Sequence, residues 1–154
     1  MELKIIEEAC LAFLQVATKA EGKNRLESLL IRLSKLQEVT LSIDPFEAPL
    51  SSLKHPEEQE NLDNLRSKLS EAYPNLGLYH CLSCTDLGRE PEIYIGDAID
   101  DLLDIYREVT LAMSTWKKEP LTAVSDLKIS YWNHWGRHLN NLQKIIFESL
   151  HNET

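Results

Sequence analysis

Apolar residues recur at steps of three and four along most of the chain, which is the spacing of one face of a helix. One such face follows Arg25: Leu26, Leu29, Leu30, Leu33, Leu36 and Val39. An earlier face has the same period: Leu3, Ile6, Cys10, Phe13, Leu14 and Ala17. Residues 21–24, which include Gly22 and Asn24, separate the two periodic segments. A short turn between two amphipathic helices predicts an antiparallel pair.

Three further helices are expected downstream. Pro56 suits the first turn of a third helix, because a residue there needs no backbone N–H donor. A fourth helix is expected to begin near Asp97, and a fifth to begin at Pro120 and continue to about Leu150. The periodic apolar positions of the fourth helix are Ile99, Leu102, Leu103, Tyr106, Val109, Met113 and Trp116.

The stretch at residues 74–96 interrupts the helical pattern. It contains Gly77, Gly88, Pro91 and Gly96, and it is long for a connection within a compact domain. Its run Ile93-Tyr94-Ile95 is compatible with at most a short strand. The sequence therefore predicts a single all-α domain over residues 1–154. We expect a bundle of four to five helices with up-down topology and a long irregular loop at about 74–96.

Composition narrows the classes of partner. The 154 residues are enough for one domain with a substantial core. The 16 basic and 25 acidic side chains give a net charge of −9, which repels phosphate backbones and anionic lipid. No local basic patch offsets this, because the only adjacent basic pair, Lys117-Lys118, is followed by Glu119. We therefore expect neither nucleic acid nor a membrane as a partner.

The start of the chain and its cysteines indicate a location. Met1 to Lys4 lead directly into an amphipathic pattern, so no signal peptide is expected. No apolar run approaches the length that spans a membrane. The three cysteines, Cys10, Cys81 and Cys84, are an odd number in a domain that can fold without disulfides. A reducing cytoplasm is the expected location, with Cys81 and Cys84 as free thiols.

One segment concentrates rare residue types at helical spacing: Tyr131-Trp132-Asn133-His134-Trp135-Gly136-Arg137-His138. Histidines four apart on a helix project from the same side, and such pairs commonly supply two imidazoles to one metal ion. The complete His-Glu-x-x-His signature is absent, because Trp135 and Gly136 fill its middle.

The last helix has an apolar stripe on a helical wheel of about 100° per residue. The stripe consists of Val124, Leu127, Tyr131, Trp135, Leu142, Ile145 and Ile146. His138 lies within this stripe and His134 lies on its shoulder, so both imidazoles are expected to point toward the core or its edge. The favoured interpretation is two hydrogen-bonded structural histidines, because few helical histidine pairs complete a metal site. The alternative is half of a metal or ligand site.

The aspartates of the fourth helix are the candidates to complete such a site: Asp97, Asp100, Asp101 and Asp104. On the wheel, Asp97, Asp101 and Asp104 lie roughly opposite the apolar stripe of that helix. We therefore expect them to face solvent or another element, away from histidines that point into the core. Acidic residues in a first helical turn also have an ordinary explanation, because they interact favourably with the helix dipole.

Tyr106 and Arg107 are further candidates on the fourth helix. Tyr106 falls on the apolar stripe, so its hydroxyl is expected to reach a buried acceptor, for which either histidine is suitable. Arg107 flanks the stripe and could pair with an acid on a neighbouring helix or with an anionic ligand. A structural role is the favoured interpretation for both, as it is for the aromatic ring of Trp135.

Two runs together carry a family resemblance: Asp97-Ala98-Ile99-Asp100-Asp101-Leu102-Leu103-Asp104-Ile105-Tyr106-Arg107-Glu108 and, some twenty residues later, the segment 131–138. An acidic segment leading into Asp-Ile-Tyr-Arg, then a His-Trp-Gly-Arg-His run on the last helix, resembles the bacterial family domain of unknown function 5063. The resemblance is close over the C-terminal third of the chain. It implies an all-helical bacterial protein and supplies no activity.

Two other motifs are incomplete. The run His80-Cys81-Leu82-Ser83-Cys84 resembles half of a zinc knuckle, but a closed site needs four ligands, and the role of the run stays open. Ser125 and Ser130 precede the histidines without the glycine-rich elbow that a nucleophilic serine requires.

Two classes of function remain open. The favoured one is a non-catalytic accessory or protein-interaction domain that engages another protein or a second copy of itself. The alternative is a metal- or small-ligand-binding module or an enzyme, with a site around His134 and His138. The candidate site residues are His134, His138, Tyr106, Arg107, Asp101, Asp104 and Trp135. The sequence names no cofactor, metal or substrate, and it leaves open whether the protein is an enzyme.

Overall fold

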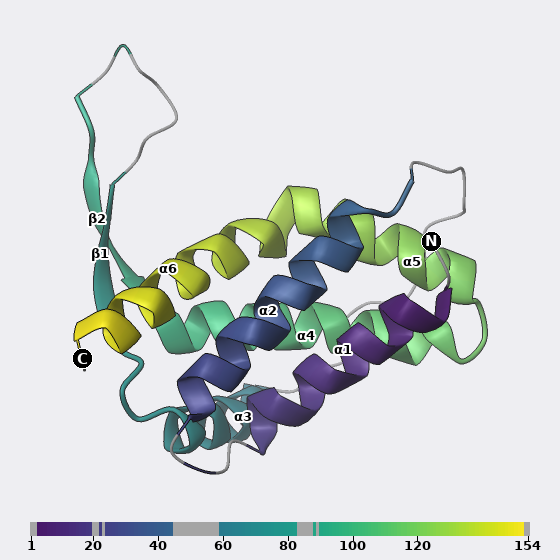
Figure 1. Cartoon of the computed structure of the whole chain (residues 1–154), viewed down its shortest axis with the longest axis horizontal. Helices are drawn as coiled ribbons and strands as arrows, with labels where there is room; N and C mark the ends of the chain where they lie inside the picture. Colours follow the sequence, from purple (N-terminus) through teal and green to yellow (C-terminus); the bar gives the residue numbers. More distant parts are fainter. Residues whose placement is uncertain are drawn as a thin grey trace.

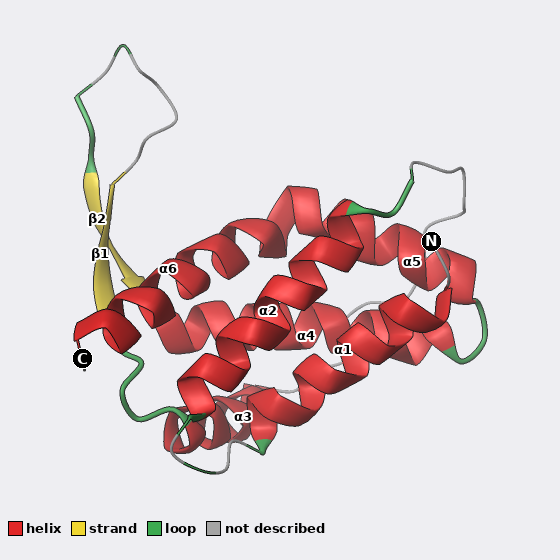
Figure 2. Ribbon diagram, in the orientation of Figure 1, coloured by secondary structure: helices red, strands yellow, loops and turns green. Residues whose placement is uncertain are grey.

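The structure, a computed structural model, describes residues 3–19, 22, 24–44, 59–82, 88 and 90–152. The α-helices are α1 (Leu3–Thr18), α2 (Arg25–Leu41), α3 (Gln59–Ala72), α4 (Ala98–Trp116), α5 (Pro120–Ser130) and α6 (Gly136–Asn152) (Figure 1). A π-helical turn, η1 (Tyr131–Trp135), joins α5 to α6. Two strands, β1 (Leu78–Leu82) and β2 (Ile93–Asp97), pair as an antiparallel hairpin. Helices dominate the described part of the chain (Figure 2), which confirms the all-α prediction.

The bundle consists of α1, α2, α4 and the continuous segment from α5 to α6, which pack on one another. Neighbouring members of this bundle run antiparallel (Figure 1). Helices α1 and α6 each contact both α2 and α4. These four helices therefore form a closed ring in which α1 and α6 lie on opposite sides. Helix α3 packs outside this ring, against α1 and α4. The predicted antiparallel pairing of the first two helices is thus confirmed. Among the described residues, no helix combines the length and the apolar composition needed to cross a lipid bilayer.

Helix α4 lies at the centre of these contacts, because α1, α3, α5 and α6 all pack against it. Its buried residues therefore occupy more than one face: Ala98, Ile99, Asp101, Leu102, Leu103, Ile105, Val109, Ala112, Thr115 and Trp116. Asp101 is 5% exposed, and it is the only charged residue among those that the structure describes as buried. A carboxylate in such a place requires polar partners, because an unpaired buried charge is strongly destabilising.

The start of α4 follows from its sequence. The side chain of Asp97 caps the helix by accepting from the backbone N–H of Ile99 at 2.9 Å and of Asp100 at 3.4 Å. Arg66 of α3 pairs with Asp97 at 2.7 Å and also contacts Asp100. The predicted helix start near Asp97 is confirmed, and two of the four aspartates serve to dock α3 on α4.

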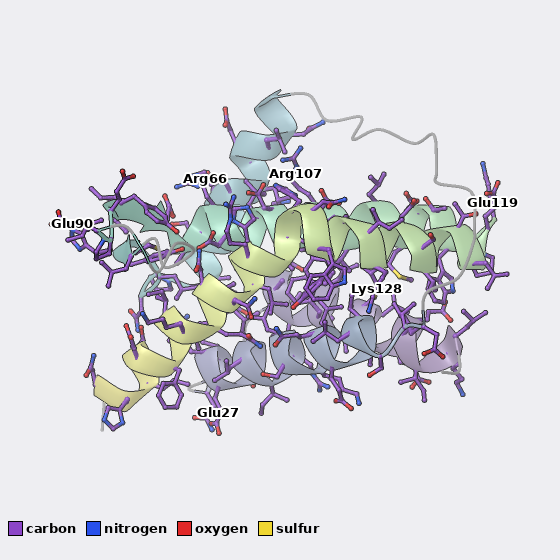
Figure 3. All side chains as sticks on the ribbon, turned by 90° about the horizontal axis from the view of Figure 1, so that it is seen from above. Glu27, Arg66, Glu90, Arg107, Glu119 and Lys128 are labelled. Atoms are coloured by element: carbon purple, nitrogen blue, oxygen red, sulfur yellow. The ribbon has the colours of Figure 1, made fainter. Side chains whose placement is uncertain are left out.

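The C-terminal end of α2 is held by a lysine from α5. Lys128 donates from Nζ to the backbone carbonyl oxygens of Thr40 at 3.1 Å and Leu41 at 2.8 Å (Figure 3). The last carbonyl groups of a helix have no partner within the helix, so a lysine that reaches them satisfies exposed acceptors and the helix dipole together. This contact holds α5 against the C-terminal end of α2.

The last helix begins at Pro120 as predicted and remains helical through Asn152. At η1 the backbone hydrogen bonds span five residues instead of four. The N–H of Gly136 donates to the carbonyl oxygen of Tyr131, five residues earlier. Figure 1 shows the ribbon changing direction where α5 passes into α6. An ideal Cβ on Gly136 would lie only 2.5 Å from the Tyr131 carbonyl oxygen, so this close turn requires glycine.

The prediction of an irregular loop over residues 74–96 is wrong in part, because most of its described residues form the hairpin. Tyr79 of β1 lies opposite Gly96 of β2, and a Cβ on Gly96 would stand 2.4 Å from the Tyr79 ring. The hairpin projects from one end of the bundle (Figure 2). Its pairing joins segments ten or more residues apart, and such non-local contacts leave little trace in local periodicity.

The incomplete zinc-knuckle run begins on this hairpin. His80 is exposed on β1, and Cys81 is half-buried with a free thiol. Ser83 and Cys84 lie outside the described residues, so the state of Cys84 stays a prediction.

Candidate metal centre

Two histidines of the last helix meet two carboxylates of α4. His138 Nδ1 lies 2.6 Å from Asp101 Oδ1, and His134 Nδ1 lies 3.1 Å from Glu108 Oε1. Each bond spans the interface between α4 and the segment made of η1 and α6. The two imidazole rings are 5.1 Å apart at 71°.

The expectation that Asp101 and Asp104 face away from the histidines is wrong. It assumed that α4 buries one stripe, whereas α6 covers the face opposite that stripe. The assumed position of His138 inside the apolar stripe is also wrong, because η1 breaks the 100° step on which the wheel depends. Leu139 takes the buried position, while His138 lies half-buried at the edge of the core, which agrees with the expectation that its imidazole points toward the core or its edge.

Asp104 completes a cluster with the same two histidines. Its Oδ2 lies 3.5 Å from His138 Nε2. One ligand atom each from Asp104, His134 and His138 can be chosen so that all three lie within 4.8 Å of one another. Two imidazoles and one carboxylate form a donor set that transition metals accept.

Hydrogen bonding determines which nitrogen each histidine can offer. Nδ1 of His138 is bonded to Asp101 and Nδ1 of His134 to Glu108, so Nε2 of each ring is left for a ligand. A carboxylate behind the imidazole orients the ring and raises its basicity in many metal sites. Both histidines of this cluster have such a carboxylate.

The cluster is accessible from one side. The side chain of His134 is 43% exposed, that of Asp104 25% and that of His138 19%. Three protein ligands at a partly exposed position would leave coordination positions for water or a small molecule, as in catalytic rather than structural zinc sites.

The electrostatics follow from these contacts. The pKa of His138 is raised from its ordinary value, foremost by the hydrogen bond to Asp101, with Asp104 adding to the effect while burial and Arg137 oppose it. The pKa of Tyr79 is raised as well, foremost by burial and then by its hydrogen bond to Asp101. The Tyr79 phenol therefore stays protonated and acts as a donor near neutral pH.

The remaining predicted residues lie around the cluster in different ways. Arg107 forms an ion pair with Asp104 at 3.5 Å within α4 and emerges beside α3 (Figure 3). Tyr106 is half-buried against the core, and the hydrogen bonds of the two histidines go to Asp101 and Glu108, so the part of its hydroxyl stays a prediction. Trp135 is fully buried and donates from Nε1 to Ser130 Oγ at 2.9 Å. The geometry thus places Trp135 in the core and not in the cluster.

Two residues that contact the site, Glu108 and Tyr79, were not among the candidates that the sequence indicated. Glu108 lies four residues after Asp104 and seven after Asp101, so helical spacing alone could have placed the three acids on one face. Tyr79 donates its hydroxyl proton to Asp101 Oδ2 from the hairpin. No local signal in the sequence indicates that contact, because it depends on the unpredicted sheet.

Comparison with known proteins identifies the family. The family model described as domain of unknown function 5063 matches residues 3–152. The chain belongs to this family. The resemblance inferred from the two C-terminal runs is therefore confirmed, and membership extends over nearly the whole chain.

A solved structure shares the fold of this family 5063 member. The crystal structure of protein BF1032 from Bacteroides fragilis matches with a TM-score of 0.68 at 16% identity, covering 96% of this chain and 88% of that one. At this identity the likeness shows a common fold. No curated protein matches the chain.

Proposed function

We propose that this family 5063 protein binds a divalent transition-metal ion through Asp104, His134 and His138 and presents open coordination positions to a small ligand. The observation that carries the proposal is the pair of Nδ1 contacts, which direct both Nε2 atoms away from their carboxylates. The convergence of the three side chains within 4.8 Å supports it.

The spacing of the donor atoms suits a small ion. Ligand atoms about 2.0–2.2 Å from a tetrahedral zinc ion stand about 3.3–3.6 Å apart from one another. The 3.5 Å separation between Asp104 and His138 already matches this distance. His134 is the most exposed of the three side chains, so a small rotation of its ring can close the remaining gap.

The donor types indicate which ions fit best. Imidazole nitrogen suits zinc, iron, nickel and copper, whereas calcium and magnesium prefer oxygen ligands throughout. Asp101, Asp104 and Glu108 also bring three carboxylates to the cluster, and a divalent cation would offset their charge. We therefore expect Zn²⁺, or Fe²⁺ in a reducing environment, ahead of Ca²⁺ or Mg²⁺.

The direct test is metal analysis of protein purified without a histidine tag, together with calorimetric titration of Zn²⁺. We expect one equivalent of bound metal, and at least a tenfold loss of affinity in His134→Ala because one of three ligands is removed. His151→Ala is the matched control, since His151 is exposed in the last turn of α6, thirteen residues after His138. Absent Zn²⁺ binding, or equal affinity in His134→Ala and wild type, would contradict the proposal.

A second candidate function is self-association through the hairpin, and a specific surface favours it. One face of the two strands exposes four large apolar side chains: Leu78 (74%), Leu82 (56%), Ile93 (69%) and Ile95 (66%). Contiguous exposed apolar surface commonly marks an interaction site. The one carboxylate of this face is Asp97, opposite Leu78, and it is already paired with Arg66, so two copies with a net charge of −9 could meet there without an unpaired acid between them.

Sedimentation analysis over a range of concentrations tests this second candidate. We expect a concentration-dependent dimer, and a monomer when Ile93→Ser and Ile95→Ser are combined. A wild-type chain that stays monomeric at about 100 μM, a concentration at which even weak specific dimers associate, would exclude it.

The proposed location is the cytoplasm. Cys10 and Cys81 are free thiols, and free cysteines persist most readily in a reducing compartment.

A further inference from the structure

The hairpin is connected to the candidate metal site through one intermediate residue, Asp101. Tyr79 donates its hydroxyl proton to Asp101 Oδ2, and Oδ1 of the same carboxylate lies 2.6 Å from His138 Nδ1. Both oxygens of this buried carboxylate therefore have a partner, one from the sheet and one from the last helix. Because a carboxylate is planar, fixing one oxygen also fixes the direction of the other.

The hairpin backbone determines where the Tyr79 ring lies. Gly96 stands opposite Tyr79 in the strand register, and the ring occupies the space that a side chain at this position would need. The base of the hairpin is joined to α4, since the N–H of Ala98 donates to the carbonyl oxygen of Gly77 at 3.1 Å. The phenol is thus held by backbone geometry within reach of Asp101.

From this chain of contacts we infer that Tyr79 is a positioning residue for His138 and acts through Asp101; the inference rests on the proposed metal function. With Oδ2 bonded to the phenol, Asp101 presents Oδ1 as the acceptor for the imidazole proton on Nδ1. This selects the neutral tautomer whose lone pair is on Nε2, the atom that faces Asp104. Outer partners of this kind commonly change metal affinity 10- to 100-fold.

The two histidines differ in this support. His134 is backed by Glu108, whose contact joins only α4 and the last helix. His138 is backed by Asp101, which in turn depends on a residue of the hairpin. The hairpin is therefore part of the site, although its strands contribute none of the three proposed metal ligands.

A comparison of Tyr79→Phe with Tyr94→Phe in the full chain tests this inference. Tyr94 lies on the partner strand and is 45% exposed, so the control removes a hydroxyl from the same hairpin and leaves the Tyr79 contact with Asp101 in place. The first readout is the tautomer of His138 in metal-free protein, from nitrogen-15 NMR at a pH where the ring is neutral. We expect the Nδ1–H form in wild type and in Tyr94→Phe, and a mixture of both tautomers in Tyr79→Phe.

The second readout is Zn²⁺ affinity, which should fall about tenfold in Tyr79→Phe and stay unchanged in Tyr94→Phe. An unchanged His138 tautomer in folded Tyr79→Phe would overturn the inference whatever the affinity, because a merely structural tyrosine lowers stability without moving that signal. If Tyr79→Phe does not fold, Gly96→Ala displaces the Tyr79 ring, since its Cβ would lie 2.4 Å from that ring, and decides by the same tautomer signal. Failure of wild type to bind Zn²⁺ would end the proposed function alone, since the tautomer is measured without metal.

Discussion

The two sides of the segment from Tyr131 to His138 differ in what holds them. On one side, Tyr131 and Trp135 are buried edge to face with ring centroids 4.9 Å apart, and Gly136 fits beneath the first ring. On the other side, His134 and His138 are held by hydrogen bonds to acids of α4. The first side depends on shape and the second on polar partners. Substitutions on the two sides should therefore affect different measurements.

The largest expected effect is on the apolar side. Trp135→Ala should lower the free energy of unfolding by about 3–5 kcal/mol, because it truncates a fully buried aromatic side chain. Urea denaturation measures this loss. Zn²⁺ affinity, determined where the variant is still folded, should change little. A cost below about 1 kcal/mol would place Trp135 outside the core, since truncated core aromatics cost several times more.

A smaller loss should follow from a single added methyl group. Gly136→Ala places Cβ 2.5 Å from the Tyr131 carbonyl oxygen, so the backbone of the turn must shift, at a cost of about 1–3 kcal/mol. Gly77→Ala is the matched control, because no atom lies within 4 Å of its added Cβ. Equal thermal midpoints for the two variants would show that the close turn is not required for stability.

On the polar side, substitutions of the two histidines should differ in how much they lower the free energy of unfolding. His138→Ala leaves the buried Asp101 without one partner and should cost about 1–3 kcal/mol. His134→Ala breaks a more exposed pair and should cost less than about 1 kcal/mol. Both should weaken Zn²⁺ binding at least tenfold. If His134→Ala proved the more destabilising of the two, the assignment of His138 as the deeper residue would be wrong.

The smallest effect should be a pH dependence of the metal-free protein. The folded pKa of His138 is raised above the ordinary value of 6.5, so its proton is held more tightly in the folded state. The resulting stabilisation is complete below the ordinary value and is lost as the pH rises through the raised one. The difference in unfolding free energy between wild type and His138→Gln should therefore shrink across this window. A difference that grows with pH would contradict the raised pKa.

Much of this fold is readable from the sequence, because helical periodicity and end signals are local. Pro120 and Asp97 mark helix starts that the structure has within one residue. The two histidines and two of the aspartates were also identified as candidates, but their arrangement and the contacts of Glu108 and Tyr79 were not. A helical wheel assumes regular winding and burial on one side, and α4 is covered on several sides while the last helix changes its winding.

The hairpin and its contact with the site could not be predicted in the same way. Strand pairing between β1 and β2 is a non-local choice, and the pattern at Ile93-Tyr94-Ile95 names no partner. The sequence therefore suggested that Tyr106, which lies on the same helix as the acids, is the tyrosine that hydrogen-bonds to the polar residues of the site. In the structure Tyr79 does so, and it reaches Asp101 only after the sheet has formed.

The π-turn has a consequence for how this helix tolerates change in length. Leu127, Tyr131, Trp135 and Leu139 are all buried and follow one another at intervals of four. On a regular helix each such step drifts by about 40°, so three steps amount to about 120°, or a third of a rotation. The π-turn η1 compensates for this drift because it accommodates one extra residue. The buried side chains before and after it therefore stay on the same side of the helix. Deleting one residue from 131–135 should restore regular winding and keep every later side chain within about 20° of its present direction, because eleven steps of about 100° nearly complete three turns. The spacing of buried residues thus records an insertion that the helix can lose while His138 still faces α4.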